Sequence, residues 1–472
     1  MAADRATRAG PGRARSRPLY AEVADAGSLT RFGEEIEAGN PSEWPGYPDQ
    51  LRRARKAAGA RHAVTTAMAT VGGEACVLVG FEFPFLGGSM GTAEGARIAR
   101  AFSVAVAERL PIVCVSASGG SRMQEGTSAL LQMQAVAAAI AGARRAGIPH
   151  VAVAGDPTTG GVWSSLIADA DVLISVPGAR VSFSGSRTRP AGSDSRSPEY
   201  LADGKWDHGF VDVLAPVPEL RSEVAAVVRL LSPRSRGDGP GRAPLPPWPA
   251  GQDDDDGPSG ADAWTHVGGA RSPRRARADR WLAGYFEQTT EIRGDRCGGV
   301  DPGLRCGFGS HSGATIAYVA QTGVPSTPAG YRTAARLLRL AARFRLPVLT
   351  LIDTPGAAAA PADEAAGVGP AIAELFVAMA SSQVPITSVV IGEGVSGGAL
   401  ALASPSDLWI ARDGYLAVTA PELASLILKL GVHMVPQVAA WLRLTPAELM
   451  SRGIVRGIIG PPAQAVSGPD PR

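Results

Sequence analysis

The amino-acid sequence predicts an α/β protein that contains two tandem copies of one strand–helix unit. Three observations lead to this prediction. Short runs of Val, Ile, Leu and Ala alternate with helical patterns, the same order of segments occurs twice, and a stretch without apolar periodicity separates the two occurrences. Short apolar strands that alternate with helices are typical of a mostly parallel sheet with helices on its faces.

Each predicted copy consists of a helix, a buried strand and a glycine turn, followed by a second helix, strand and glycine turn. In the first copy these segments are residues 99–108, 112–115, 119–120, 127–146, 151–154 and 160–161. In the second copy they are residues 331–344, 348–352, 353–356, 371–381, 386–391 and 394–398. A proline precedes each strand, and Pro111 is as far from Pro149 as Pro347 is from Pro385. Two unrelated α/β units are the alternative, but they would share this spacing only by chance.

Composition divides the chain into five parts. Residues 1–19 form a basic tail that we expect to be flexible, and residues 463–472 form a second tail. The first copy occupies 20–231 and the second 275–462. Between them, 232–274 is rich in Pro, Gly and Asp and is predicted to be a disordered linker, because it offers no apolar face to bury.

The bulk composition excludes several classes of protein. With 472 residues, 45% of them hydrophobic, and a formal charge of +2, the chain can bury a sizeable core but lacks the basic excess of a dedicated nucleic-acid binder. No apolar run reaches the ~18 residues of a membrane span, and the arginine-rich N-terminus lacks the apolar segment of a secretory signal. The four cysteines include no C-x-x-C pair, so we expect free thiols, no zinc and a cytoplasmic location.

The glycine turns are the main candidates for a functional site. Each lies where a buried strand ends and a helix begins, so that backbone N–H groups without helical partners lie at the positive end of the helix dipole. Three turns are the richest: Ser118–Gly126, Asp156–Gly161 and Gly394–Ala399. Such amides can bind a phosphate or a developing oxyanion, although any single turn can also serve strand–helix packing alone.

The sequence is poor in other catalytic signatures. No segment fits G-x-x-x-x-G-K-[ST] or a dinucleotide-binding G-x-G-x-x-G, and no histidine accompanies a nucleophile in a known pattern. Glycine turns without a nucleophile indicate polarisation of carbonyl groups, such as enolate formation from a thioester. Arg122, Arg187 and Arg332 are candidates for contacts with coenzyme A phosphates, with a salt-bridged or solvated arginine as the alternative at each.

Several motifs resemble the carboxyltransferase of bacterial acetyl-CoA carboxylase. Motifs of the first copy resemble its beta subunit and motifs of the second copy its alpha subunit, each set in order. The first set is Phe85–Gly91, Ser116–Gly126 and Asp156–Val162, and the second is Gly294–Arg296, Pro328–Arg332, Asp353–Ala357 and Ile391–Leu400. By this resemblance the chain is identified as a fusion of the two subunits.

The resemblance implies two tandem crotonase-like (ClpP/crotonase) domains, each a ββα spiral. It implies that the chain transfers the carboxyl group of carboxybiotin to acetyl-CoA to give malonyl-CoA, a reaction of fatty acid biosynthesis carried out by an ATP-dependent complex. Carried over by motif, the catalytic oxyanion holes are Gly119–Gly120, for the thioester on the beta-like half, and Gly398–Ala399, for biotin on the alpha-like half. The expected substrate-binding residues are Gly87, Gly88, Ser89, Met90, Arg122, Gly160, Gly161, Arg332, Gly356 and Gly397.

The resemblance also implies partners. No biotin-attachment motif and no ATP-grasp signature is visible in the sequence. Carboxybiotin must therefore arrive on a separate biotin carboxyl carrier protein, charged by a separate biotin carboxylase. A homo-oligomer is expected, because in this family the two halves of one site come from opposing protomers.

Three departures from the family pattern keep alternatives open. The zinc ribbon of the beta subunit is missing, residues 184–190 do not read Gly-Pro-Arg-Val, and residues 362–369 lack the Glu-Glu-Arg-Gly-Gln motif. The alternatives are a carboxyltransferase for propionyl-CoA or another acyl-CoA, an acyl-CoA decarboxylase of secondary metabolism, and a non-catalytic paralogue.

Overall fold

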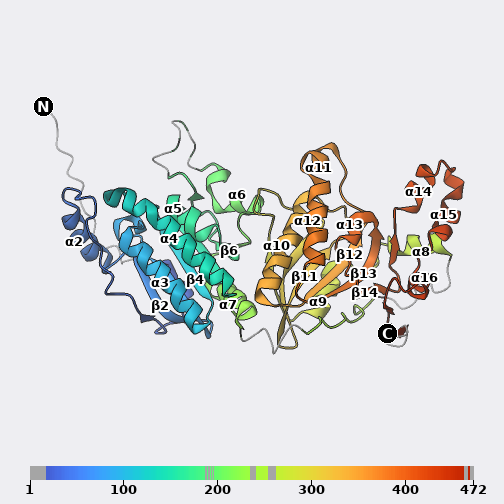
Figure 1. The fold of residues 1–472 in the computed structure, drawn as a ribbon, viewed down its shortest axis with the longest axis horizontal. Coiled ribbons are helices and arrows are strands. Elements are labelled where there is room, and N and C mark those ends of the chain that lie inside the picture. Colours follow the sequence, from blue (N-terminus) through green and yellow to red (C-terminus); the bar gives the residue numbers. More distant parts are fainter. Residues whose placement is uncertain are drawn as a thin grey trace.

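Two α/β halves lie side by side along the long axis of the molecule (Figure 1). The computed structural model describes residues 17–185, 189, 192, 194, 196–233, 241–252 and 262–461, together with the backbone of 466 and 467. Most of both predicted tails, and Arg187, lie outside the described residues. Each half contains one mixed sheet, and the two sheets have the same order of strands.

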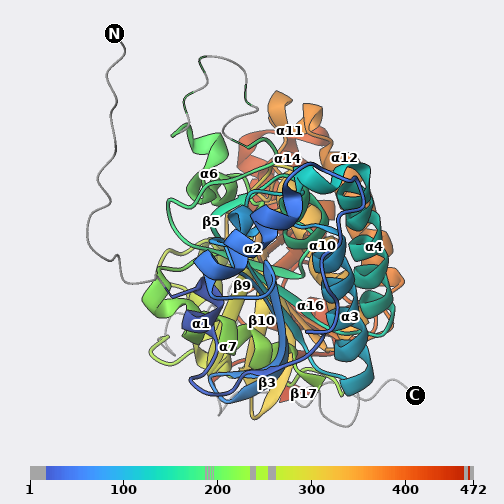
Figure 2. The ribbon, with the colours of Figure 1, turned by 90° about the vertical axis from the view of Figure 1, so that its left-hand side faces the viewer.

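The first sheet begins with antiparallel strands and continues with parallel ones. Its strands, in spatial order, are β1 (Thr30–Arg31), β2 (Val64–Val71), β3 (Glu74–Phe81), β4 (Ile112–Ser118), β5 (His150–Thr159), β6 (Val172–Ser175) and β8 (Val213–Leu214), and β7 (Val181–Ser182) pairs with the end of β5. Its helices are α1 (Leu19–Val23), α2 (Tyr47–Ala58), α3 (Thr92–Glu108), α4 (Gly126–Arg145), α5 (Gly160–Val162), α6 (Ala202–Asp207) and α7 (Leu220–Leu231). Figure 2 shows α3 and α4 on one side of the sheet and α1 and α7 on the other.

The second sheet repeats this plan. Its strands, in spatial order, are β9 (Gln288–Ile292), β10 (Leu304–His311), β11 (Ala314–Gln321), β12 (Val348–Thr354), β13 (Ile386–Val395), β14 (Leu408–Ala411), β16 (Gly457–Ile459) and β17 (Val466–Ser467), and β15 (Tyr415–Ala417) pairs with the end of β13. The helices are α8 (Ala263–Ala270), α9 (Ala278–Tyr285), α10 (Pro328–Phe344), α11 (Pro361–Ala365), α12 (Val368–Ala380), α13 (Ser396–Leu400), α14 (Pro421–Ile427), α15 (Val435–Leu442) and α16 (Pro446–Ser451).

The predicted duplication is confirmed by matching details in the two halves. Helices α3 and α10 are both 17 residues long, and each is followed by an arginine with positive φ, Arg109 at 53° and Arg345 at 56°. The ladder between the two central strands is interrupted at the same place, between Ser116 and Ser118 in one sheet and between Ile352 and Thr354 in the other. One constant shift along the chain relates all these pairs, so the halves have the same fold down to a single bulge.

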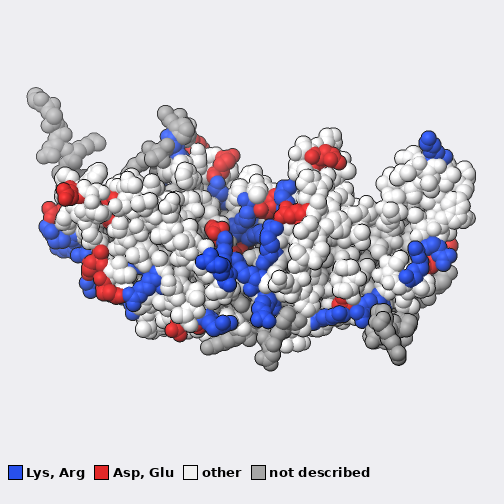
Figure 3. Space-filling model, in the orientation of Figure 1, with Lys and Arg blue, Asp and Glu red and all other residues white. Residues whose placement is uncertain are grey.

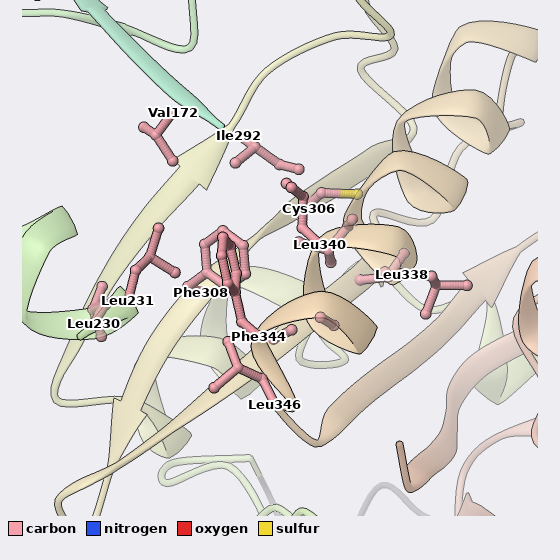
Figure 4. Close-up of a cluster of buried hydrophobic side chains, with 14 of the residues drawn as sticks. Val172, Leu230, Leu231, Ile292, Cys306, Phe308, Leu338, Leu340, Phe344 and Leu346 are labelled. Carbon is pink, nitrogen blue, oxygen red and sulfur yellow. The ribbon is translucent and has the colours of Figure 1, made fainter. Parts of the chain in front are cut away.

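The two halves share one hydrophobic core. Leu230 and Leu231 of α7, from the first half, pack toward Phe308 of β10 and Phe344 of α10, from the second (Figure 4). The same cluster contains side chains from both sheets, among them Val172 and Ile292. The boundary between the halves is therefore part of the protein interior rather than a hinge between separate domains.

Buried ion pairs also join the halves. The carboxylate of Asp212 is fully enclosed and receives Arg296 at 2.5 Å and Arg336 at 3.1 Å. Burial alone would raise the pKa of Asp212, but the two guanidinium groups outweigh it and hold the pKa below its ordinary value. Asp171 is paired with Arg343 in the same way, and basic side chains gather at this boundary on the face shown in Figure 3.

The prediction of a disordered linker over 232–274 is wrong for the parts that the structure describes. Residues 241–252 lie against the second half, where Trp248 packs edge-to-face on Trp281 with ring centroids 5.8 Å apart. Residues 263–270 form α8, whose Val267 is fully buried. Single apolar anchors hold this segment, and such anchors leave no periodic pattern in the sequence. Residues 234–240 and 253–261 lie outside the described residues.

The described residues lack two kinds of feature. Among them, no helix combines the length and apolar character that a bilayer crossing requires. In the same residues, no cluster of three or more His, Cys, Asp or Glu side chains is arranged to hold a metal ion.

His150 at the start of β5 predicts a pH-dependent stability. Its imidazole is buried against Phe102, neither ring nitrogen has a hydrogen-bond partner among the described residues, and burial lowers its pKa to about 4. Because the folded-state pKa lies below the unfolded value, this group stabilises the fold above pH ~6.5 and loses that contribution as the pH falls towards 4.

We expect denaturant unfolding of the wild type to show a loss of about 2 kcal/mol between pH 7.5 and pH 5 that is missing in His150→Leu. The measurement is the difference between the two proteins at each pH. An equal pH dependence in both would contradict this assignment.

Candidate active site at the paired strand ends

In each half, two turns that follow neighbouring parallel strands come into contact. In the second half, β12 leads into the turn at Gly356 and Ala357, and β13 leads into α13. A Cβ added at Gly398 would lie 2.6 Å from the amide nitrogen of Ala357 and 3.1 Å from the carbonyl carbon of Gly356. These distances are too short for any side chain, so glycine at 398 is what allows the two turns to meet.

The first half has the same contact between its β4 and β5 turns. A Cβ at Gly120 would lie 3.2 Å from the carbonyl oxygen of Thr159 and 3.4 Å from the amide nitrogen of Gly161. Gly120 and its counterpart Gly356 both have positive φ, at 103° and 135°. Gly160 and its counterpart Ser396 share a left-handed backbone as well, at 60° and 65°. Both halves therefore bring together the residues that the glycine motifs predicted.

The first predicted oxyanion hole, Gly119–Gly120, is wrong as a pair of free donors. The Gly119 amide donates to the carbonyl oxygen of Gly87 at 2.8 Å, and the Gly120 amide donates to Oγ of Ser118 at 3.1 Å. The reason is that the segment around Met90 pairs with the turn as a short parallel bridge. The turn after β4 is thus satisfied from within the protein.

The amides at the start of α5 are the better candidates in this half. The Gly160 amide donates to the carbonyl oxygen of Phe183 at 3.1 Å. The amides of Gly161 and Val162 have no hydrogen-bond partner among the described residues. They occupy helical positions that precede the first intrahelical bond, where an N–H group has no partner in its own helix.

The second predicted hole, Gly398–Ala399, is shifted by one residue in the structure. Helix α13 starts at Ser396, so the amides of Gly397 and Gly398 precede helical hydrogen bonding, whereas Ala399 is the first position with a helical acceptor. No partner for the amides of Gly397 or Gly398 is found within the described part of the chain. Gly161–Val162 and Gly397–Gly398 are counterparts under the duplication, so each half has one pair of unpartnered amides at the same place.

The predicted contacts around Gly87 to Met90 serve the β4 turn. A Cβ at Gly88 would lie 2.2 Å from the carbonyl oxygen of Ala117, and Met90 is fully buried. Oγ of Ser89 donates to the carbonyl oxygen of Leu86 at 2.8 Å. These residues pack against the turn that follows β4 and hold it in position.

Arg122 is not available to a coenzyme A phosphate. Its side chain is 0% exposed and pairs with Glu94 at 2.9 Å and Glu125 at 3.3 Å. Burial would lower the pKa of Arg122, but the Glu94 carboxylate and the Tyr47 hydroxyl together outweigh this and raise the pKa. Glu125 in turn accepts hydrogen bonds from Tyr47 and from Thr92, so the cluster fixes the turn that follows Gly120.

Arg332, Gly356 and Gly397 lie on the second half and remain candidates. Arg332 is 30% exposed and pairs with Asp295 at 2.7 Å, and its guanidinium donates to the carbonyl oxygen of Ala366 at 3.2 Å. A Cβ at Gly356 or at Gly397 would meet no atom within 4 Å. The two glycines therefore border open space beside the free amides.

Sequence reasoning missed the side chains that support the second pair of amides. The carbonyl oxygen of Gly398 accepts from Nε2 of Gln321 at 3.1 Å and from the hydroxyl of Tyr331 at 3.4 Å. Both side chains are fully buried, and burial raises the pKa of Tyr331, so its hydroxyl keeps its proton and donates. Neither residue belongs to a glycine turn, so no local pattern marks it.

The free amides indicate what the site can do. Each pair lies at the N-terminal end of a helical turn and can donate two hydrogen bonds to one oxygen atom. Such a site stabilises negative charge on a carbonyl oxygen without a protein nucleophile. Two such pairs in one chain can act on two carbonyl compounds.

Comparison with known proteins gives the family. A model described as acetyl co-enzyme A carboxylase carboxyltransferase-like matches residues 259–468, and a carboxyl transferase domain matches residues 27–189. A Salinispora tropica protein named acetyl-coenzyme A carboxylase carboxyl transferase subunits beta/alpha is 36% identical over 463 residues, covering 94% of this chain and 82% of its own. A Mycobacterium bovis protein named probable biotin-dependent acyl-coenzyme A carboxylase beta3 subunit is 32% identical over 455 residues, covering 93% and 87%.

Solved structures share the fold. Transcarboxylase 12S, described as a hexamer with methylmalonyl-coenzyme A bound, matches with a TM-score of 0.74 at 19% identity, over 94% of this chain and 86% of that one. A single-chain long-chain acyl-CoA carboxylase matches with a TM-score of 0.73 at 19% identity, over 94% and 45%. The predicted crotonase-like fold of both halves is thereby confirmed. From its sequence, its duplicated fold and its relatives, the chain belongs to the biotin-dependent carboxyltransferases, as a fusion of beta-like and alpha-like halves.

Proposed function

We propose that the chain is the carboxyltransferase component of an acetyl-CoA carboxylase and that it converts acetyl-CoA to malonyl-CoA. The observation that carries this proposal is the pair of unpartnered amides at the same position in each half. A carboxyl transfer between biotin and a thioester involves two carbonyl oxygens, and the duplicated fold offers one donor pair for each. Relatives over nearly the whole chain carry the name of this enzyme.

In the first half, the amides of Gly161 and Val162 would hold the thioester oxygen of acetyl-CoA. Removing a proton from the methyl carbon puts negative charge on this oxygen, and two amide donors stabilise it. The neighbouring turn at Gly120 is kept at contact distance by the buried Arg122–Glu94 pair. This half therefore contributes two donors that are already in position before the reaction starts.

In the second half, the amides of Gly397 and Gly398 would hold the ureido oxygen of biotin. The residues fit this group, because two unpartnered donors lie beside two glycines, 356 and 397, at which a Cβ would meet no atom within 4 Å. When bound, carboxybiotin supplies an activated carboxyl group. Gln321 and Tyr331 hold the carbonyl oxygen of Gly398, in the peptide that directly follows the donors.

The proposed reaction needs partners and a location. We propose a separate biotin carboxyl carrier protein and a separate biotin carboxylase, as the family pattern implies. We also place the reaction in the cytoplasm, because all four cysteines are free thiols.

A second candidate substrate is favoured by particular relatives. The Mycobacterium bovis relative is named for acyl-CoA rather than acetyl-CoA, and transcarboxylase 12S is described with methylmalonyl-CoA bound. Propionyl-CoA is therefore the alternative acceptor. A decarboxylase remains a rival proposal because the same fold can carry another reaction. A non-catalytic paralogue is the other rival, motivated by the altered residues 184–190 and 362–369.

An assay with purified carrier protein and biotin carboxylase tests the function. We expect ATP- and carrier-dependent carboxylation, fastest with acetyl-CoA and slower with propionyl-CoA and butyryl-CoA. Fastest turnover of propionyl-CoA would replace the substrate proposal. Consumption of malonyl-CoA in the absence of any biotin protein would favour the decarboxylase, and no product from any combination would favour the non-catalytic paralogue.

A matched pair of glycine variants tests the placement of the donors. Gly398→Ala should lower kcat/KM about 100-fold or more, because its Cβ would collide with the Ala357 amide and displace the donor. Gly119→Ala should stay within a few-fold of wild type, since its φ is not positive and its Cβ would meet its nearest atom at 3.6 Å. Equal activity of the two folded variants, checked by circular dichroism, would refute the placement.

We also propose that the working unit contains at least two chains. Helix α14 and the turn that leads from it to α15 expose apolar side chains, with Leu426 71%, Ile427 70% and Val432 88% exposed, and α4 exposes Leu130 and Leu131. Apolar surface of this extent is typical of a protein–protein interface.

Light scattering should therefore show a dimer or a larger assembly. Leu426→Asp should shift it towards the monomer and lower activity, whereas Leu245→Asp, at an exposed leucine outside these helices, should do neither. A stable and fully active wild-type monomer would contradict the proposal.

A further inference from the structure

The β13 strand contains a bulge at which two backbone groups lose their ladder partners. Ile352 pairs with Val390 and Thr354 pairs with Gly394, so β13 carries two extra residues opposite Asp353. The carbonyl oxygen of Ile391 and the amide of Glu393 lie in this interval. Buried backbone groups of this kind need other partners.

Asp353 and Arg275 supply those partners. The guanidinium NH1 of Arg275 donates to the carbonyl oxygen of Ile391 at 2.6 Å, and Oδ1 of Asp353 accepts from the amide of Glu393 at 3.0 Å. NH2 of Arg275 reaches both carboxylate oxygens of Asp353, at 2.9 and 2.8 Å. The pair is enclosed, since the side chains are 2% and 0% exposed.

Two glycines make room for this pair. A Cβ at Gly392 would lie 2.3 Å from NH2 of Arg275 and 2.4 Å from Oδ1 of Asp353. A Cβ at Gly323 would lie 2.3 Å from NH1 of Arg277, which also binds Asp353 at 3.0 Å. Glycine at both positions therefore leaves the space that Arg275 and Arg277 occupy beside Asp353.

The first half satisfies the same bulge without any such pair. The position of Glu393 is taken there by Pro157, which has no N–H, and the position of Asp353 is taken by Ala117. The carbonyl oxygen of Gly155, counterpart of Ile391, accepts from Oγ1 of Thr158 at 2.8 Å. Only the second half therefore depends on a side chain from the segment that precedes it.

Arg275 acts on the strand ends that carry the site. Asp353 lies three residues before Gly356, and Glu393 lies four residues before Gly397. Arg271, from the same segment, binds the carboxylate of Glu393 at 2.9 Å, and this carboxylate also accepts from the hydroxyl of Tyr415. The segment 271–277 therefore fixes the position of the β13 turn relative to the β12 turn.

We propose that Arg275 is a positioning residue for the amide pair Gly397–Gly398, so that the segment joining the halves controls the biotin side of the site. The inference rests on the proposed function for its kinetic consequence, but not for its structural one. Loss of the guanidinium should loosen the second pair of turns and leave the first pair unchanged.

The structural arm is hydrogen–deuterium exchange of Arg275→Met and wild type. We expect amides in peptides spanning 353–358 and 390–400 to exchange about tenfold faster in the variant, and those spanning 116–122 and 158–164 to be unchanged. Arg339→Met, which removes an exposed ion pair between Arg339 on α10 and Glu374 on α12, should change neither set. Unchanged exchange at 390–400 in Arg275→Met would overturn the inference whatever the enzyme's activity.

The kinetic arm follows acetyl-CoA release when the carboxyl group of malonyl-CoA passes to N1 of free biotin and the N1 proton passes to the acetyl carbon. Arg275→Met should raise the KM for biotin about tenfold and leave the KM for malonyl-CoA unchanged. Arg275→Lys should give an intermediate KM for biotin, since lysine keeps the charge beside Asp353 but cannot reach every acceptor at once. If the methionine variant fails to fold, the lysine variant takes its place in both experiments.

The outcomes separate the inference from the proposed function. A wild type that transfers no carboxyl group to biotin defeats the proposed function, while the exchange experiment still decides the role of Arg275. A wild type that does transfer it, with equal increases in both KM values in Arg275→Met, indicates a general structural role and defeats the inference.

Discussion

The site depends on the close contact of two turns at the ends of neighbouring parallel strands. In each half, glycine sets that contact, because a Cβ at Gly120 or Gly398 would press on the backbone of the opposite turn. The bulge in the central ladder directs the second strand into a short helix at this point, and the first amides of that helix are left without partners. Donors for a carbonyl oxygen follow from the backbone alone, without any catalytic side chain.

The two halves keep this geometry by different means. The first half uses Pro157 inside the bulge, Thr158 at its end and a buried Arg122–Glu94 pair next to the turn, all from its own sequence. The second half uses Asp353 together with an arginine that comes before its first strand. Unrelated side chains thus stabilise the same backbone geometry in the two halves. This is expected because the buried backbone groups need hydrogen-bond partners, and any side chain that supplies them is acceptable.

Much of the fold could be predicted from the sequence, because buried strands and helices leave periodic patterns and equal proline spacings. The site could be predicted only to the level of the turns. Whether the amide of Gly119 is free depends on Gly87, a residue distant in sequence, and no local pattern shows that bond. The role of Arg275, the first residue after the predicted linker, could not be predicted for the same reason, since its partners Asp353 and Ile391 are far along the chain. Arg122 was a candidate for phosphate binding because of its guanidinium group. The sequence does not show that two carboxylates, those of Glu94 and Glu125, already enclose this group.

The boundary between the halves limits how the site can move. Separating them would expose Phe308 and Phe344 to water and part Asp212 from Arg296 and Arg336. Exposing each of these buried phenylalanines alone costs about 1.5–3 kcal/mol, and the rest of the shared cluster adds to this. Opening of the chain at this boundary is therefore too costly to accompany each turnover. Movements that admit biotin or acyl-CoA must come from segments outside the shared core, such as the exposed hairpin of α14 and α15, or from the arrangement of one chain against another.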